Sequence, residues 1–330
     1  MTAFIYVFLC SFAVGVIIAP PVIYLIKKLK ARQTILTYVS QHKDKEGIPT
    51  MGGIIFLVPA VIFYFVFARG QNRLSFVALA VTLAYGLIGG LDDAIKVIFK
   101  RNLGLKAYQK IISQLVIAVL ATVFAYKNGY VGSQIYIPII KQYVETGWFY
   151  IPFTIIAYIA TTNCVNLTDG LDGLAGSTVV LYLSVVFVII AGIYLESVDA
   201  GKTLYEQETY NLLVFVAALA GGIAAFLVFN SHKAKIFMGD TGSLALGGAV
   251  ASVAVFIKNP LIIATIGIMF VMSGISVIIQ VISFKLRKKR VFLMAPLHHH
   301  LEMKGLNESK IVSLYSVITV VAGAVTLLII

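Results

Sequence analysis

The chain has 330 residues, of which 60% are hydrophobic and only 12% are charged. A soluble domain of this length needs more charge on its surface, so the composition excludes an ordinary water-soluble globular protein. The net charge of +12 would suit a nucleic-acid-binding protein, but basic cytoplasmic loops explain such an excess in a membrane protein. We therefore expect an all-α, polytopic membrane protein with a single domain over residues 1–330 and no nucleic-acid partner.

Apolar runs long enough to cross a bilayer recur along the chain, since a spanning helix needs about 20 mainly apolar residues. The ninth run is long enough to tilt or break, and Gly274 could form the bend. Residues 128–149 are polar and aromatic and predict a short hairpin or loop between the fourth and fifth runs. We predict ten spans, at residues 4–26, 51–69, 75–91, 109–126, 150–165, 177–195, 210–229, 242–257, 260–284 and 309–330.

The basic residues are distributed unevenly between the connecting loops. The loops after the odd-numbered spans carry 20 of the 26 Lys and Arg residues, and the loops after the even-numbered spans carry the other 6. Cytoplasmic loops of membrane proteins are enriched in Lys and Arg. The pattern therefore predicts odd-numbered loops in the cytoplasm and both termini outside.

Five carboxylates lie at the predicted cytoplasmic ends of spans. Asp92 and Asp93 follow the third span, and because adjacent residues on a helix point about 100° apart, we expect them to serve different purposes. Asp169 and Asp172 share a face if their segment is helical, whereas an open glycine-rich turn would present backbone N–H groups to a ligand. Asp240 could bind a metal ion, and it or its neighbour could also cap the eighth span.

Basic and imidazole side chains accompany these carboxylates at the same face. Lys45, Lys96 and Lys110 come from the first two cytoplasmic loops, and a histidine triplet occupies residues 298–300 before the last span. Three consecutive histidines cannot all bind one metal ion from a regular helix. We therefore expect one or two of them to contact an anionic group.

The combination of these groups indicates a class of chemistry. Five carboxylates in one cleft repel one another unless a cation lies among them, and oxygen ligands favour Mg²⁺ or Mn²⁺ over zinc. A carboxylate-bound metal ion surrounded by lysines and histidines is typical of phosphate or pyrophosphate chemistry. A site at the membrane rim fits a reaction between a soluble phosphorylated substrate and a lipid phosphate.

Five motifs in order resemble those of the polyprenyl-phosphate N-acetylhexosamine-1-phosphate transferase superfamily, over essentially the whole chain. Within it the sequence looks most like the phospho-N-acetylmuramoyl-pentapeptide transferases, because of the Pro-Leu-His-His-His element. One departure from the pattern is Ile48, where Thr is expected. The motifs are residues 49–53 (PTMGG), 91–93 (LDD), 166–173 (NLTDGLDG), 237–243 (FMGDTGS) and 296–302 (PLHHHLE).

The resemblance implies transfer of phospho-MurNAc-pentapeptide from its UDP-linked donor to undecaprenyl phosphate in the bacterial plasma membrane. It implies Mg²⁺ as the cofactor with Asp240 as its ligand, a cytoplasmic active site, contact with membrane lipid, and a chain that could form a homodimer. The catalytic residues that it implies are Asp92, Asp93, Asp240 and His298. The substrate-binding residues that it implies are Lys45, Thr50, Lys96, Lys110, Asn166, Asp169, Gly170, Leu171, Asp172, Asn230, Phe237, His299 and His300.

Two other functions remain open at this point. A sibling transferase would use UDP-N-acetylglucosamine as its donor, and the histidine triplet argues against it. A transporter or lipid flippase would place polar residues near the bilayer midplane, where each charge costs about 2.5–3.5 kcal/mol on insertion scales. The charged clusters here lie at one face instead, which favours an enzyme.

Overall fold

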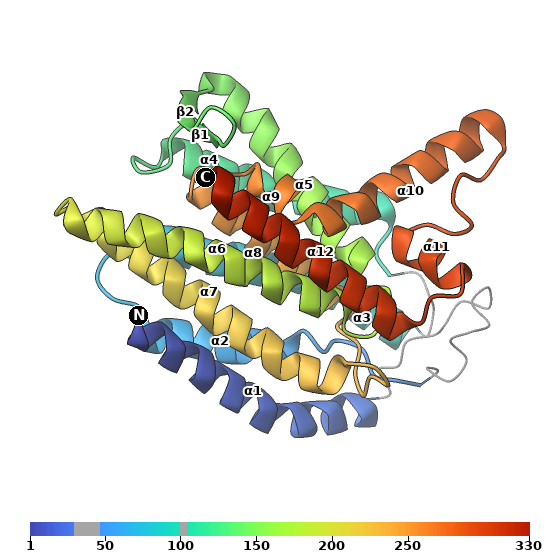
Figure 1. Ribbon diagram of the computed structural model, residues 1–330. Helices are drawn as coiled ribbons and strands as arrows, with labels where there is room; N and C mark the ends of the chain where they lie inside the picture. Colours follow the sequence, from blue (N-terminus) through green and yellow to red (C-terminus); the bar gives the residue numbers. More distant parts are fainter. Residues whose placement is uncertain (30–46, 100–103) are drawn as a thin grey trace.

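A computed structural model describes residues 1–29, 47–99 and 104–330. Within these ranges the chain is helical apart from one small hairpin (Figure 1). The elements are α1 (Thr2–Lys28), α2 (Ile54–Phe67), α3 (Arg73–Ile98), α4 (Ala107–Lys127), β1 (Gln134–Ile137), β2 (Gln142–Glu145), a 3₁₀ turn (Gly147–Phe149), α5 (Tyr150–Thr168), α6 (Leu174–Asp199), α7 (Thr203–Asn230), α8 (Gly239–Phe256), α9 (Ile262–Thr265), α10 (Ile268–Arg287), α11 (Leu297–Met303) and α12 (Glu308–Ile329).

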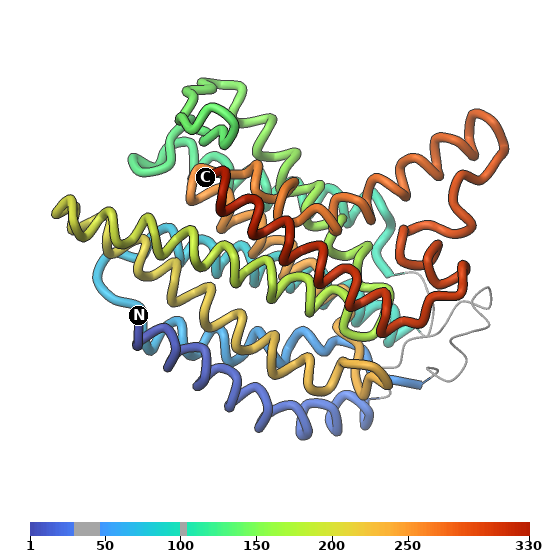
Figure 2. Tube along the Cα trace, in the orientation of Figure 1, coloured from blue at the N-terminus to red at the C-terminus, as the bar shows by residue number. Residues whose placement is uncertain are grey.

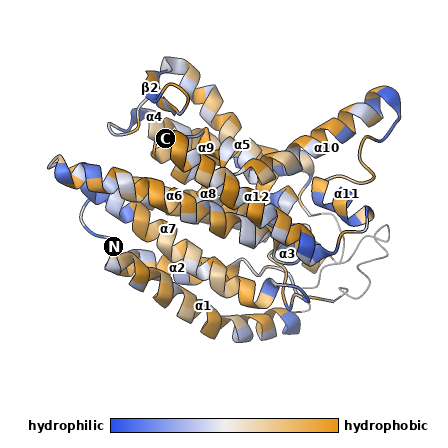
Figure 3. Cartoon of the chain, in the orientation of Figure 1, coloured by the Kyte–Doolittle hydropathy of each residue, from blue (hydrophilic) through white to orange (hydrophobic). Residues whose placement is uncertain are grey.

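The all-α membrane class that the composition predicts is confirmed. Among the described residues, nine helices are long and apolar enough to cross a membrane, and α2 is an apolar helix of only 14 residues. Figure 3 shows hydrophobic residues along the helices and hydrophilic ones gathered towards their ends. Two predicted boundaries were too short, because α3 continues through residues 92–98 and α7 begins at residue 203 rather than 210. Asp92 and Asp93 therefore lie within a helix and do not open a loop.

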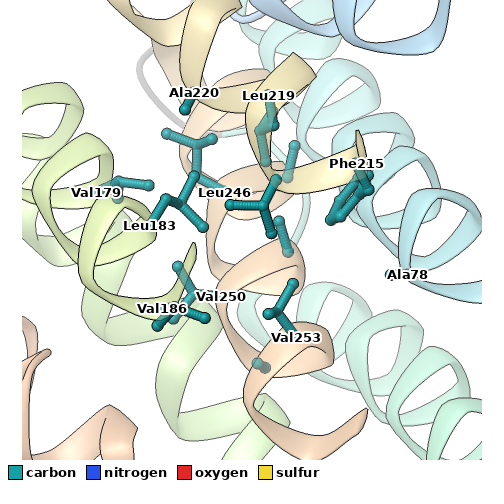
Figure 4. Packing of buried hydrophobic residues seen from close by; sticks show 14 of the residues in the cluster. Ala78, Val179, Leu183, Val186, Phe215, Leu219, Ala220, Leu246, Val250 and Val253 are labelled. Atoms are coloured by element: carbon teal, nitrogen blue, oxygen red, sulfur yellow. The ribbon is translucent and has the colours of Figure 1, made fainter. Parts of the chain in front are cut away.

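The buried centre of the bundle is formed by α8, whose residues are almost all inaccessible to solvent, and by α7, most of whose residues are buried. In Figure 4, Leu246 and Val250 of α8 lie between Leu183 of α6 and Phe215 of α7. Aliphatic side chains packed this closely fix the relative positions of the helices, because interiors pack at the density of organic crystals. The central helices thus form a rigid support for whatever their ends carry.

Glycines let two pairs of helices approach backbone to backbone. A Cβ atom at Gly89 of α3 would overlap the main-chain carbonyl group of Asp240 on α8. A Cβ atom at Gly247 of α8 would lie 2.5 Å from the Cα atom of Thr162 on α5. Small residues commonly mediate such contacts in membranes, where no hydrophobic effect draws helices together.

The start of α3 is fastened to α7 by polar side chains. Glu208, which is fully buried, accepts hydrogen bonds from the backbone N–H groups of Arg73 and Leu74 at 3.1 and 2.8 Å. The side chain of Asn211 accepts the N–H of Arg69 at 2.8 Å and donates to main-chain oxygens of the same connection. These bonds satisfy donors that a helix start leaves without intrahelical partners.

The two chain ends lie at one end of the bundle, and α11 lies at the other (Figures 1 and 2). At the first of these ends, the Phe4 ring lies edge-on to that of Tyr194 near the end of α6. The Tyr136 hydroxyl on β1 donates to the carbonyl oxygen of Ile330. The antiparallel pair β1–β2, in which Ile135 faces Val144, confirms the expected hairpin.

The ninth predicted span is broken, but not where the sequence suggested. The chain leaves α9 and enters α10 at Gly267, whereas Gly274 lies inside α10 and packs against the sulfur of Cys164. The prediction of a bend at Gly274 was therefore wrong, because that glycine makes room for a neighbouring helix. Beyond the contact, α10 diverges from the bundle and leads to α11 (Figure 1).

Candidate active site

Asp93, which lies on α3, caps the amino-terminal end of α8. Its carboxylate accepts the N–H of Asp240 at 3.2 Å, and the N–H and hydroxyl of Thr241 at 2.9 and 2.7 Å. Gly239 precedes these donors with a φ of +72°, and a Cβ atom there would lie 2.5 Å from Asp93 Oδ2. The predicted cap by Asp240 or Thr241 was therefore wrong, since the cap of α8 comes from α3.

Asp92 points to the other side, as the 100° rotation between neighbours predicts. One oxygen accepts the N–H of Leu105 at 2.8 Å, and the other lies 2.6 Å from the Lys96 ammonium group. A Cβ atom at Gly104 would overlap the Asp92 carboxylate. The two carboxylates are 3% and 2% exposed and have different partners, as expected from their different directions, and their different purposes stay a prediction.

Asp240 is the point where four segments converge. Its Oδ2 lies 2.9 Å from Lys96 Nζ and 3.0 Å from Lys110 Nζ, and its Oδ1 accepts a hydrogen bond from Asn166 Nδ2 at 2.7 Å. Asn166 also donates to Ser243 Oγ at 2.7 Å. Asp240 is thus held at both oxygens by cationic or amide donors, on the first turn of the most buried helix.

The group Asp92, Asp93 and Asp240 fits a divalent cation of the Mg²⁺ type. One oxygen from each lies within 4.8 Å of the others, and an all-oxygen donor set suits Mg²⁺. Lys96 Nζ lies 2.6, 3.8 and 2.9 Å from these three carboxylates, which shows that their arrangement accommodates positive charge. Asp93 accepts three hydrogen bonds from the start of α8, whereas Asp92 and Asp240 both lie within 3 Å of Lys96 Nζ, so an ion would take the place of that ammonium group between these two.

Residues 169–173 form an open turn between α5 and α6, so the helical alternative for this segment is wrong. Burial raises the pKa of Asp169 to about 8, and the negative charges of Asp240, Asp93 and Asp172 act in the same direction. A Cβ atom at Gly170 would overlap Nε2 of His298. The turn is therefore in direct contact with the histidine segment.

The far side of this turn contacts the connection between α7 and α8. Asp172, which is 4% exposed, accepts the N–H of Ala234 at 3.1 Å. Asn230 accepts the N–H of Gly173 at 3.0 Å and donates to the carbonyl oxygen of Ile236 at 2.8 Å. Both polar atoms of the Asn230 side chain thus hold loops in place.

The segment at residues 49–53 pairs with residues 237–238 beside Asp240. Phe237 donates its N–H to Pro49 and accepts that of Gly52, both at 2.8 Å, and its side chain is half-buried. Thr50 is buried next to Gly239. The side chain of Leu171 packs into a small apolar cluster with Tyr315.

The three histidines of α11 occupy different surroundings. His298 is fully buried, and in the described structure neither of its ring nitrogens has a hydrogen-bond partner. Burial lowers the pKa of His298 to about 3, and the neighbouring His299 acts in the same direction. His299 Nδ1 lies 3.0 Å from Glu302 Oε2, and His300 Nδ1 accepts the N–H of Leu293 at 3.1 Å. The His298 ring lies against Gly170 of the 169–173 turn.

Most of the site residues expected from the sequence meet at one end of the bundle. Lys45 lies outside the described residues. Leu105 and Gly89 are parts of the site that no sequence motif indicated, and Ser243 stands in the 237–243 motif without an expected role. A signal existed for Gly89, because paired glycines inside a helical pattern often mark a close approach of two backbones.

Comparison with known proteins gives concordant matches over the chain. The family model for Glycosyl transferase family 4 matches residues 73–258, and Phospho-N-acetylmuramoyl-pentapeptide-transferase signature 1 matches residues 45–57. The chain is 44% identical over 322 residues to the phospho-N-acetylmuramoyl-pentapeptide-transferase of Clostridium novyi (strain NT), covering 97% of this chain and 95% of that protein.

Two further relatives carry the same name. The protein of Clostridium perfringens (strain 13 / Type A) is 45% identical over 312 residues, which cover 94% of this chain and 93% of the relative. The protein of Clostridium kluyveri (strain ATCC 8527) is 41% identical over 322 residues, which cover 97% of each. The likeness therefore extends over nearly the full length of all three.

Proposed function

The chain belongs to the phospho-N-acetylmuramoyl-pentapeptide-transferase family, and from this premise we propose that it makes lipid I in peptidoglycan biosynthesis. It transfers phospho-MurNAc-pentapeptide from UDP-MurNAc-pentapeptide to undecaprenyl phosphate and releases UMP. The observation that carries the proposal is the convergence of Asp92, Asp240, Lys96 and Lys110 at one end of a membrane bundle. A buried carboxylate pair surrounded by lysines suits two phosphates that must approach each other.

The enzyme lies in the bacterial plasma membrane with this end in the cytoplasm. The excess of Lys and Arg in the odd-numbered loops supports that orientation. The separation of the chain ends from α11 (Figure 1) agrees with it, because both termini are then outside. The soluble UDP-linked donor enters from the cytoplasm, and the lipid acceptor from the bilayer.

The donor's uridine occupies the pocket between the 169–173 turn and residues 237–238. The Phe237 ring stacks on uracil, and the Leu171 backbone, Asp172 and Lys45 complete the pocket. The remaining donor contacts come from Thr50, Asn166, Asp169, Gly170, Asn230, His298, His299 and His300.

Phosphates are held at the opposite side of this region. Lys96 and Lys110 exchange part of their contact with Asp240 for the donor diphosphate and the lipid phosphate. Asp240 and Asp92 would hold Mg²⁺, which would neutralise negative charge on the diphosphate. Lysines and a metal ion together offset the repulsion that otherwise keeps two anions apart.

The reaction is a direct in-line displacement. A phosphate monoester has a second pKa of about 6, so the lipid phosphate is mostly a dianion at neutral pH and needs little help from a base. Its oxygen forms a bond to the β-phosphorus of the donor while the bond from that phosphorus to the bridging oxygen breaks, and UMP leaves with that oxygen. Asp92 orients the attacking phosphate. Recovery of phosphate covalently bound to Asp92 or Asp93 during turnover would contradict this order of events.

The first experiment measures UMP release by the purified protein with UDP-MurNAc-pentapeptide and undecaprenyl phosphate, with and without Mg²⁺. We expect release that depends on the lipid and the metal ion. Activity with UDP-N-acetylglucosamine alone would retain the superfamily and change the donor. No UMP release with either donor from folded protein would overturn the proposal and favour a transporter.

A further inference from the structure

A second group of metal-ligating side chains lies apart from the Asp92, Asp93 and Asp240 cluster. Asp172 comes from the turn before α6, His232 from the connection after α7, and Glu308 is the first residue of α12. One ligand atom from each lies within 4.8 Å of the other two. Three segments far apart in sequence thus bring an imidazole and two carboxylates to one place.

The donor types indicate which cation would bind. The first cluster offers carboxylate oxygens only, whereas this group adds an imidazole nitrogen. Imidazole suits Zn²⁺ and similar first-row transition ions, while Mg²⁺ prefers oxygen ligands. An Asp, a Glu and a His would leave one position of a tetrahedral ion for water.

The geometry requires a modest contraction around the ion. Zn–N and Zn–O bonds of about 2.0–2.2 Å place neighbouring ligand atoms of a tetrahedron roughly 3.3–3.5 Å apart. His232 is exposed and Glu308 is half-buried, so both can move by the remaining distance. Asp172 is buried and oriented by its hydrogen bond from Ala234, and it provides the fixed point.

The surroundings give an ion access and also set a limit on its affinity. A hollow of about 580 Å³ is lined by His232, Glu302, residues 305–307, Glu308, Ser309 and Lys310. An ion can therefore reach both surface ligands from the solvent. Lys310 opposes a cation, and Asp172 and Glu308 have other interactions with which the ion must compete.

We propose that Asp172, His232 and Glu308 form a binding site for one transition-metal ion of the Zn²⁺ class. The site is independent of the Mg²⁺ group on α3 and α8. Because Asp172 also belongs to the uridine pocket proposed above, a bound ion withdraws that carboxylate from the donor. That consequence rests on the proposed function, whereas binding of the ion does not.

The test is calorimetric titration of the purified full-length protein with Zn²⁺, without substrates and in saturating Mg²⁺ to occupy the oxygen-only cluster. We expect one Zn²⁺ per chain for the wild type and for the control Lys235→Ala, which changes an exposed neighbour of His232. Binding should weaken at least tenfold in His232→Ala and in Glu308→Gln. Wild-type binding in both of these variants would overturn the proposal.

A second measurement needs no variant and so does not depend on how a variant folds. Co²⁺ bound to the wild-type protein should give the visible absorption of a tetrahedral ion with a nitrogen ligand, and Zn²⁺ should remove it. A spectrum of octahedral Co²⁺ alone would overturn the proposal. With substrates present, Zn²⁺ should raise the donor KM in the wild type and not in His232→Ala. Zn²⁺ binding without UMP release under any condition would contradict the proposed function only.

Discussion

The carboxylates of α3 and α8 and the histidines of α11 reach the same end of the bundle by different routes. Asp93 and Asp240 are on helices that touch backbone to backbone at Gly89. His298 is on the seven-residue helix α11, which follows α10 after a connection of residues 288–296. Helix α10 leaves the bundle (Figure 1), and the His298 side chain packs against the 169–173 turn. The first arrangement joins two main chains, which cannot rotate apart, whereas the second joins a side chain to a turn.

This difference suggests a division of labour. Groups that must be held in place for bond-making belong on the rigid pair, because small misplacements there are costly to the rate. Groups that surround a large donor can be on the adjustable segment, since closing segments commonly complete a site after binding. Changes at α3 and α8 should therefore lower kcat, and changes at α11 should mainly raise KM.

The largest effect is expected for Asp240→Asn. The amide keeps the shape of the side chain but loses the charge that pairs with Lys96 and Lys110, so turnover should fall by at least about 10²-fold. The protein should remain folded in membranes. Asp199→Asn, an exposed acid at the other end, serves as the control. Near-normal turnover in Asp240→Asn would remove this residue from the catalytic group.

Gly89→Ala tests whether the backbone contact fixes the geometry. The added methyl group overlaps the main chain of Asp240, which cannot rotate away, and overpacking of this kind costs about 1–3 kcal/mol. A displacement of the carboxylates by about 1 Å could reduce kcat by about 10²-fold. Gly90→Ala is the matched control, because its nearest atom would be 3.7 Å away. Equal activity of the two variants would contradict the assignment of the bond-making groups to the α3–α8 contact.

The neighbours Asp92 and Asp93 should respond differently to substitution. Asp93→Ala leaves the first N–H groups of α8 without their acceptor and should destabilise the protein by about 1–3 kcal/mol. Asp93→Asn should restore much of that stability, whereas Asp92→Asn should reduce kcat with little change in stability. Thermal unfolding and steady-state rates measure both. If both Asn variants lose activity without losing stability, Asp93 contacts substrate and does not merely position Asp240.

Gly170→Ala should give a smaller effect of a different kind. The methyl group would displace the His298 ring, so we expect the donor KM to rise about tenfold while kcat changes little. Gly192→Ala adds a methyl group where nothing lies within 4 Å and should leave both constants unchanged. A fall in kcat without a change in KM would show that His298 acts with the residues of α3 and α8.

The smallest effect concerns pH and the buried imidazole. The pKa of His298 is lowered from 6.5 to about 3 in the folded protein, so the unfolded chain binds a proton that the folded chain does not. This contribution to stability is complete above pH 6.5 and is lost as the pH falls towards 3, by about 1 kcal/mol at pH 6. His298→Gln should flatten this dependence in thermal unfolding between pH 7.5 and 6. An unchanged slope would show that His298 does not titrate in this way.

The sequence predicted the helices and the motif segments well, because long apolar runs and clustered charges in a membrane protein have few interpretations. It also predicted that Asp92 and Asp93 would differ. It could not predict that Asp93 caps α8, because the residues that these hydrogen bonds join are separated by 147 and 148 positions in the sequence. The Gly267 break was missed for a similar reason, because Gly274 and Gly267 look alike until the packing against Cys164 is known.

Helix α3 is held at both of its ends. Glu208 binds its first residues, and Asp93 near its last turn binds α8. With 26 residues at 1.5 Å each, it is roughly 39 Å long, which exceeds the hydrocarbon thickness of about 30 Å. A helix fixed at two points cannot tilt to match a thinner or thicker bilayer. Lipid composition should therefore have little effect on the positions of the carboxylates. The adjustment to bilayer thickness then falls to α10, and with it to the position of the histidines.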